Sequence, residues 1–198
     1  MMGMELIPEL KIGWLNGWIL VCLMFLIFGI LIKAFNKNVV ARLYDFDKSS
    51  WSKMQRAFTA IGKLLLGLVW LVLIIFTPLK IGSNVLIIGT ILYTLGLAGF
   101  IIALFNFKNT PLDQPVAKGL YRISRHPQVF MLFILFFGIC IAVGSWLLLF
   151  ILIISSLLLH FRTLAEEKAC LEKYGDSYRA YMKRVPRYFL IKTNMKEE

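Results

Sequence analysis

The chain has 198 residues, a length typical of a single domain. Hydrophobic residues make up 59% of it, charged residues only 17%, and the mean hydropathy is +0.76. A chain this short cannot bury so much apolar surface within itself, which excludes a water-soluble globular protein and indicates an integral membrane protein. The net charge of +11 is then better explained by membrane topology than by nucleic-acid binding.

Cysteine and histidine are too few and too scattered for a metal centre. Cys22, Cys140 and Cys170 show no spacing typical of a zinc site or a disulfide framework. His126 and His160 are the only histidines. We therefore expect no metal and no nucleic-acid partner.

Three apolar stretches precede residue 108. A helix that crosses a hydrocarbon core of about 30 Å needs about 20 residues. The sequence predicts such helices at residues 14–35, 57–79 and 84–107. Residues 36–56 and 108–127 are polar and basic, and we expect both segments to be loops.

The apolar stretch at residues 128–161 is too long for one crossing. As a single straight helix it would measure about 51 Å. Gly138, Gly144 and Ser145 lie in its middle, where a helical hairpin would turn. We interpret the stretch as two short antiparallel helices, residues 128–142 and residue 146 into the region of Glu166. A single tilted or kinked helix is the alternative.

The last part of the chain is soluble in character. Tyr174, Tyr178 and Tyr181 are spaced by four and three residues, so they share one face of a helix that Pro186 ends. Basic residues lie between them. This pattern predicts an amphipathic helix at the membrane interface.

Positive charge gives the orientation. With five crossings, 20 of the 22 Lys and Arg residues fall on one side, and only Lys11 and Lys80 fall on the other. Basic residues favour the cytoplasmic side. The sequence thus predicts an all-α, multi-pass protein of the cell membrane with about five transmembrane helices, the fourth and fifth forming a hairpin. The N-terminus would be outside, and the C-terminus and any active site cytoplasmic.

The hairpin would bring ionisable residues together at its open end. His126 and Pro127 begin the fourth helix, and proline suits the first turn of a helix. Arg162 and Glu166, at the end of the fifth, are one turn apart and share a face. A carboxylate there could bind an ammonium or sulfonium group, and an arginine could bind a carboxylate or phosphate. Alternatively, these residues are ordinary topology signals and a solvated helix end.

The motifs of the C-terminal half resemble those of the isoprenylcysteine carboxyl methyltransferase family and of the related phospholipid N-methyltransferases. The first motif is Gly119-x-Tyr121-x-x-x-Arg125-His126-Pro127. The second is Glu166-Glu167, followed by Tyr174-Gly175-x-x-Tyr178-x-x-Tyr181-x-x-x-Val185-Pro186-Arg187. One departure is Val129, at a position where the family usually has tyrosine.

The resemblance implies a binding site for S-adenosylmethionine as the cofactor. Carried over position by position, its residues would be Asn106, Asp113, Gln114, Pro115, Val116, Tyr121, His126, Pro127, Gln128, Val129 and Glu166. Arg162 matches a position that contacts the substrate in the carboxyl methyltransferases. Residues 1–105 carry no matching motif, so within one membrane domain residues 106–190 would be the cofactor-binding catalytic half.

The resemblance implies a membrane methyltransferase that acts on a lipid-like acceptor, most simply the carboxylate of a prenylated cysteine or a similar molecule held by Arg162. A carboxylate is already nucleophilic. A phospholipid amine would first have to lose a proton, for which Glu167 or a neutral His126 could be the base. An NADPH-dependent sterol-type reductase and a non-catalytic carrier are further alternatives, although the sequence has no glycine-rich phosphate loop.

Overall fold

The computed structural model describes residues 3–44 and 51–189. In these ranges the chain is helical, with two isolated β-bridges and no extended strand. The predicted all-α, polytopic membrane fold is confirmed. The helices are α1 (Trp18–Ala34), α2 (Lys37–Tyr44), α3 (Lys53–Leu64), α4 (Leu71–Phe76), α5 (Asn84–Lys108), α6 (Pro127–Ala142), α7 (Trp146–Tyr174) and α8 (Asp176–Arg184), with a π-helical turn at Leu65–Trp70 and a 3₁₀ turn at Gly119–Arg122.

Among the described residues, three helices are long and apolar enough to cross a membrane. They are Asn84–Lys108, Trp146–Tyr174 and the continuous helix Lys53–Phe76, which joins α3, the π-helical turn and α4. The apolar helices α1 and α6 are shorter. The presence of five apolar helices agrees with the sequence, but the number of crossings stays a prediction.

The predicted hairpin at residues 128–161 is confirmed as α6 and α7, which turn at residues 143–145. Gly144 has φ +67°, a left-handed conformation that glycine adopts without strain. The Ser145 hydroxyl accepts a hydrogen bond from Leu148 N, 3.3 Å away, and so caps the start of α7. The turn therefore follows from local chemistry.

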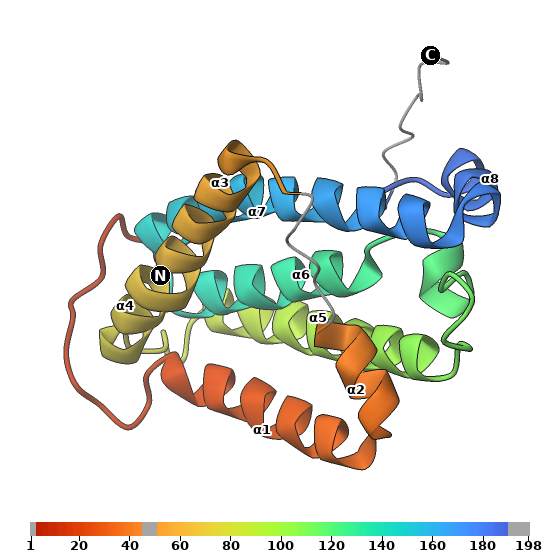
Figure 1. The fold of residues 1–198 in the computed structure, drawn as a ribbon. Coiled ribbons are helices and arrows are strands. Elements are labelled where there is room, and N and C mark those ends of the chain that lie inside the picture. Colours follow the sequence, from red (N-terminus) through yellow and green to blue (C-terminus); the bar gives the residue numbers. More distant parts are fainter. Residues whose placement is uncertain (1–2, 45–50, 190–198) are drawn as a thin grey trace.

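Helices α5 and α6 approach each other so closely that glycine is required at their contact. A Cβ atom at Gly89 or Gly96 would overlap the backbone nitrogen of Ala142 or Leu135, and one at Gly138 would overlap that of Tyr93. Small residues allow such backbone approach between helices in membranes. This pair forms a tight layer that α7 covers, as Figure 1 shows.

Two expectations about the polar segments were wrong. Residues 36–56 were expected to form a loop, but α2 occupies residues 37–44 and α3 begins at Lys53, where Ser52 and Gln55 form a capping box. In α8, Tyr178 and Tyr181 are buried against Val185. Tyr174 does not lie on the same helix as these two tyrosines. It ends α7, because Gly175 breaks the helix with φ +54°.

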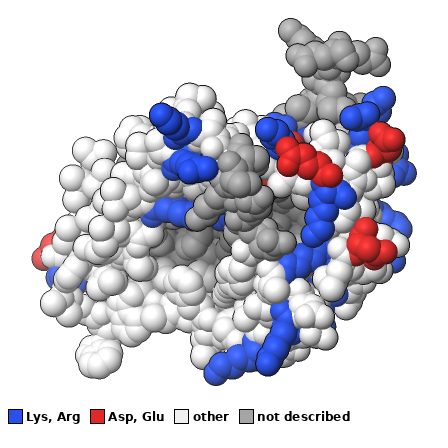
Figure 2. All heavy atoms as spheres, in the orientation of Figure 1, with Lys and Arg blue, Asp and Glu red and all other residues white. Residues whose placement is uncertain are grey.

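The two ends of the helical layer differ in charge. One end carries the segment that precedes α1 and the hairpin turn, and the other carries α2, α8 and residues 109–126 (Figure 1). On the face drawn in Figure 2, Lys and Arg side chains gather toward the α2 and α8 end. The candidate site lies at this basic end.

Candidate functional site

A cavity of about 860 Å³ lies at the basic end of the molecule. Small-molecule sites usually measure about 300–1,000 Å³, so this one is large enough for a drug-sized ligand. Its apolar part comes from Phe28 of α1, Phe100 and Leu104 of α5, and Leu132 of α6. Its polar part comes from the start of α6, the end of α7 and α8.

The start of α6 places His126 at the cavity wall. Pro127 is the first residue of α6, as expected, because its missing N–H costs nothing there. The preceding residues are held by the segment that follows α8: Arg125 N donates to Pro186 O at 2.9 Å, and His126 N donates to Arg187 O at 3.2 Å. The Arg-His-Pro triplet and the Pro-Arg pair, 61 residues later, are therefore joined by backbone hydrogen bonds.

Glu166 lines the cavity beside His126. Arg162 Nε donates to Glu166 Oε1 at 2.7 Å, as their spacing of one turn predicts. The other carboxylate oxygen, Oε2, lies 4.0 Å from His126 Nδ1. This ion pair uses the Arg162 Nε atom, so Glu166 already binds one nitrogen of the guanidinium group.

Glu167 is buried behind this wall, with 5% of its side chain exposed. Its Oε1 lies 3.0 Å from Arg125 Nε and 3.1 Å from His126 Nε2. Its Oε2 accepts from Arg187 Nε at 3.0 Å and from Nη2 at 2.7 Å. Two guanidinium groups offset the cost of burying this carboxylate, so Glu167 joins α6, α7 and the segment after α8.

The segment after α8 adds a second histidine contact. Burial lowers the pKa of Arg187, but its hydrogen bonds and attraction to Glu167 outweigh this effect, so its pKa is raised and it stays charged. The Tyr188 hydroxyl lies 2.9 Å from His160 Nδ1, and burial raises the pKa of this phenol. The segment after α8 is therefore held on α7 by Arg187, which binds Glu167, and by Tyr188, which contacts His160.

The loop after α5 is held by Asn106 and Arg42. Asn106 Oδ1 accepts from Leu120 N at 2.9 Å. Gly119, which precedes Leu120, has φ +57°, and a Cβ there would overlap the Asn106 amide. Arg42 of α2 donates to the carbonyl oxygens of Pro111, at 3.0 Å, and Gln114, at 2.6 Å. Both side chains thus fix the loop whose residues Pro115 and Val116 line the cavity.

Tyr121 and Tyr181 complete the wall near this loop. The Tyr181 hydroxyl donates to Tyr121 O at 2.7 Å. Burial raises the pKa of both phenols, so both hydroxyls stay protonated at neutral pH. They can act there only as neutral hydrogen-bonding groups and aromatic surfaces.

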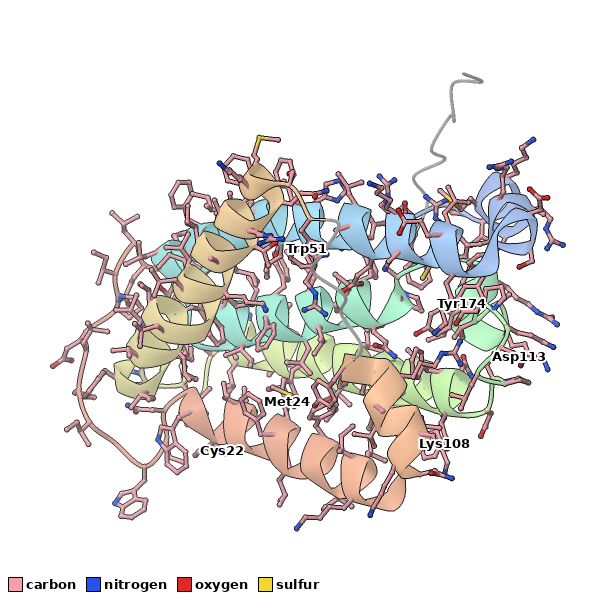
Figure 3. All side chains as sticks on the ribbon, in the orientation of Figure 1. Cys22, Met24, Trp51, Lys108, Asp113 and Tyr174 are labelled. Carbon is pink, nitrogen blue, oxygen red and sulfur yellow. The ribbon has the colours of Figure 1, made fainter. Side chains whose placement is uncertain are left out.

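The structure brings many, but not all, of the expected site residues to the cavity. Those that line it are Pro115, Val116, Tyr121, His126, Gln128, Val129, Arg162 and Glu166. Asn106, Asp113, Gln114, Pro127 and Glu167 are not among the described lining residues. Asp113 is exposed on the outer edge of the loop (Figure 3). Asn106 and Glu167 act here as supports of the wall.

Several residues around the cavity were not predicted as site residues. Arg42 and Lys63 of the N-terminal half line it, as does Trp51, which Figure 3 labels. Only tertiary structure brings them there. Arg187 could have been found, because it belongs to the Val-Pro-Arg end of the second motif.

The lining includes groups suited to a nucleoside with an amino-acid tail. The Gln128 Nε2 atom is buried, without a hydrogen-bond partner among the described atoms, in a side chain that lines the cavity. The Glu166 carboxylate can bind hydroxyl or ammonium groups, and the tyrosine rings can face a sulfonium cation.

Comparison with known protein families gave a match that includes most of the C-terminal half of the chain. The model of a family described as phospholipid methyltransferase matches residues 72–177, just over half of the chain. The match runs from α4 into the start of α8 and includes every expected site residue. No curated protein and no solved structure matched.

Proposed function

The chain belongs to the phospholipid methyltransferase family, and from this membership we propose that it transfers a methyl group from S-adenosylmethionine to a lipid-like acceptor at the cytoplasmic side of a membrane. The observation that carries the proposal is the cavity, which joins an apolar wall from α1, α5 and α6 to the His126–Glu166 wall. A ligand with a polar head and an apolar tail fits such a surface.

The cavity residues fit the cofactor. His126, Gln128 and Glu166 would bind its polar groups, and the unpartnered Gln128 amide is the most direct indication that a polar ligand belongs there. Pro115, Val116 and Tyr121 would provide the apolar contact with its base. When bound, S-adenosylmethionine supplies a methyl group activated by its positive sulfur.

The protein's part in the reaction is positioning and exclusion of water. Alignment of reacting atoms in a closed pocket supplies much of the rate of a displacement reaction. Arg42 and Asn106 hold the loop that closes the pocket, and the Glu167 cluster holds His126. Arg162 orients Glu166 through their 2.7 Å contact.

The reacting group that we favour is a carboxylate. Apart from Arg125, which is paired with the buried Glu167, the described lining holds four basic residues and two carboxylates, so the cavity as a whole attracts an anion: Arg42, Lys63, Arg162, Lys173, Glu166 and Glu172. A carboxylate attacks without a base. The prenylated cysteine expected from the resemblance is one such acceptor.

A phospholipid amine is the second candidate, favoured by the family description and by His126. If His126 Nε2 donates to Glu167 Oε1, the neutral ring presents an unprotonated Nδ1 near Glu166. That nitrogen could take a proton from an ammonium group. The phosphate group of the same lipid would form ion pairs with the basic residues that line the cavity.

Cofactor binding tests the proposal most directly. We expect detergent-purified protein to bind S-adenosylmethionine and not NADPH in a calorimetric titration. Glu166→Ala and His126→Ala should each weaken binding about ten- to a hundredfold, the effect of one charge-assisted hydrogen bond. Asp176→Ala, at an exposed position on α8, is the matched control. NADPH binding, or wild-type affinity in both cavity variants, would overturn the proposal.

The acceptor can be identified by the stability of the product. Membranes that contain the protein are incubated with methyl-labelled cofactor, and the extracted lipid is treated with mild alkali. A methyl ester releases its label as methanol, whereas an N-methyl group keeps it. If the label stays on a phospholipid after alkali treatment, the acceptor is an amine and not a carboxylate.

A further inference from the structure

Four tyrosines line the cavity where the loop after α5 meets the end of α7 and α8: Tyr121, Tyr174, Tyr178 and Tyr181. Two of their hydroxyls bind other parts of the protein. Tyr181 donates to Tyr121 O at 2.7 Å, and Tyr174 donates to Leu112 O at 3.4 Å. The hydroxyls of Tyr121 and Tyr178 make no hydrogen bond with the described atoms. These two hydroxyls therefore have a purpose other than holding the fold.

Tyr178 is the more informative of the two, because the resemblance assigns it no role. It lies on α8, one residue beyond the end of the family match, and it is 5% exposed. Burial raises the pKa of its phenol, so the hydroxyl keeps its proton. A buried tyrosine hydroxyl usually has a hydrogen-bond partner, and an unpaired one costs free energy. Since the side chain lines the cavity, a bound ligand can supply the missing partner.

The surroundings of Tyr178 indicate which part of the ligand it meets. The apolar cluster that contains Tyr178 packs against Ala117, which follows Pro115 and Val116 in the loop after α5. Both loop residues line the cavity and are expected to contact the base of the cofactor. Figure 1 shows α8 and this loop at the same end of the molecule. The apolar wall, in contrast, comes from α1, α5 and α6.

The chemistry of the hydroxyl agrees with this position. A protonated phenol has no charge and can both donate and accept a hydrogen bond. It therefore matches the neutral polar groups of a nucleoside, which are the ribose hydroxyls and the nitrogen atoms of the base. The charged groups of the amino-acid tail are better matched by Glu166 and by the basic residues of the lining.

We propose that the Tyr178 hydroxyl forms a hydrogen bond with the nucleoside part of the bound cofactor, so that α8 contributes a cofactor-binding residue. The inference rests on the proposed function and deepens it, because it adds a contact that the family's cofactor positions do not include. It also gives the two parts of the side chain different roles. The ring packs with Tyr181 and Val185 and stabilises the protein, whereas the hydroxyl binds the ligand.

Tyr178→Phe separates these roles, because it removes only the hydroxyl. We expect it to weaken S-adenosylmethionine binding about three- to tenfold in a calorimetric titration, the effect of one neutral hydrogen bond. Stability without ligand should stay the same or rise slightly in denaturant unfolding, because an unpaired buried hydroxyl is lost.

Tyr93→Phe is the matched control. Tyr93 is 3% exposed, its hydroxyl donates to Leu20 O at 2.8 Å, and it is not among the described lining residues. It should show the opposite pattern, with lower stability and wild-type affinity for the cofactor. If Tyr178→Phe destabilises the protein as much as Tyr93→Phe, its hydroxyl has a partner within the protein, and the inference is wrong.

Two related ligands identify the part of the cofactor that Tyr178 contacts. S-adenosylhomocysteine lacks the positive charge on sulfur, and methylthioadenosine lacks the amino-acid tail but keeps the nucleoside. Tyr178→Phe should weaken binding of both by the same factor as S-adenosylmethionine, measured by competition. An effect on S-adenosylmethionine alone would indicate a contact with the sulfonium group. An unchanged affinity for methylthioadenosine would indicate a contact with the tail. Either result would contradict the inference.

The two proposals fail in different ways. If the wild type does not bind S-adenosylmethionine, the proposed function is wrong and the inference fails with it. If the wild type binds all three ligands and Tyr178→Phe binds them equally well, only the role of Tyr178 is wrong.

Discussion

Glu166 and Glu167 are neighbours in sequence with opposite surroundings. Consecutive residues of an α-helix point about 100° apart. Glu166 therefore faces the cavity, whereas Glu167 faces Arg125, His126 and Arg187. We infer that Glu166 contacts ligands and that Glu167 acts through His126.

Glu167→Gln should strongly destabilise the protein. The substitution leaves the buried guanidinium group of Arg125 and the partly buried one of Arg187 without their negative partner, and loss of one partner of a buried ion pair typically costs about 3–5 kcal/mol in the free energy of unfolding. Glu172→Gln is the matched control on the same helix, since Glu172 is exposed and lies 3.9 Å from Lys168. Its effect should stay within about 1 kcal/mol. Denaturant unfolding in detergent measures both, and equal stabilities would contradict the role of Glu167.

We expect glycine to be required at position 119 for two reasons: its backbone has a positive φ, and a side chain there would collide with Asn106. Gly119→Ala would place a Cβ into the Asn106 amide and displace the loop, so we expect lower stability and weaker cofactor binding. Gly82 also has positive φ, +76°, but has nothing within 4 Å of an added Cβ. Gly82→Ala therefore shows the cost of backbone strain alone. A Gly119→Ala variant no worse than Gly82→Ala would exclude the contact with Asn106.

At the scale of elements, the contact between α5 and α6 gives the cavity a fixed floor. Gly89 and Gly96 are seven residues apart, and both meet the α6 backbone. Phe100 and Leu104, further along α5, then line the cavity together with Leu132 of α6. A shift of α5 against α6 would change the shape of this floor.

Gly96→Ala should separate α5 from α6. The added methyl group would overlap Leu135, and overpacking of this kind typically costs about 1–3 kcal/mol. Gly29→Ala in α1 meets nothing within 4 Å and should be neutral or slightly stabilising, because alanine favours the helix. Unfolding in detergent compares the two. Equal effects would mean that the helices can move apart without cost.

Local chemistry predicted the elements well where apolar length and turn residues act together. Gly144 and Ser145 predicted the hairpin turn, and Pro127 predicted the start of α6. The same reasoning missed α2, because a short basic helix has no apolar stretch to indicate it. It did not predict the π-helical turn at Leu65–Trp70, which lies within a continuous apolar stretch.

The site was predicted to the extent that its residues lie in the two motifs. His126 and Glu166 meet as the hairpin required. Sequence spacing does not show where a side chain points in the folded protein. It therefore could not predict that Glu166 and Glu167 have different surroundings, or that Lys63 lines the cavity. The segment around Arg187 was quoted in the second motif, but its position beneath the cavity wall depends on its backbone contacts with Arg125 and His126.

For the whole molecule, the structure separates the two groups of basic residues that the sequence assigns to opposite sides. Lys11 N donates to Phe76 O at 2.8 Å, and Lys80 pairs with Glu5 at 2.5 Å, so both lysines lie at the end with the hairpin turn. The candidate site and α8 lie at the other end (Figure 1). If the helices cross a membrane, these ends face different compartments.

We expect the Lys11 end to be outside and α8 to be cytoplasmic, since 20 of the 22 Lys and Arg residues would then be inside. Cysteine is introduced at Lys11 or at Lys183 of α8 in a protein whose Cys22, Cys140 and Cys170 have been replaced. A membrane-impermeant maleimide should label the Lys11→Cys protein in intact cells and the Lys183→Cys protein only after permeabilisation. Labelling of both from one side would contradict the odd number of crossings. The reverse pattern would keep five crossings but place the cavity outside, away from the cytoplasm.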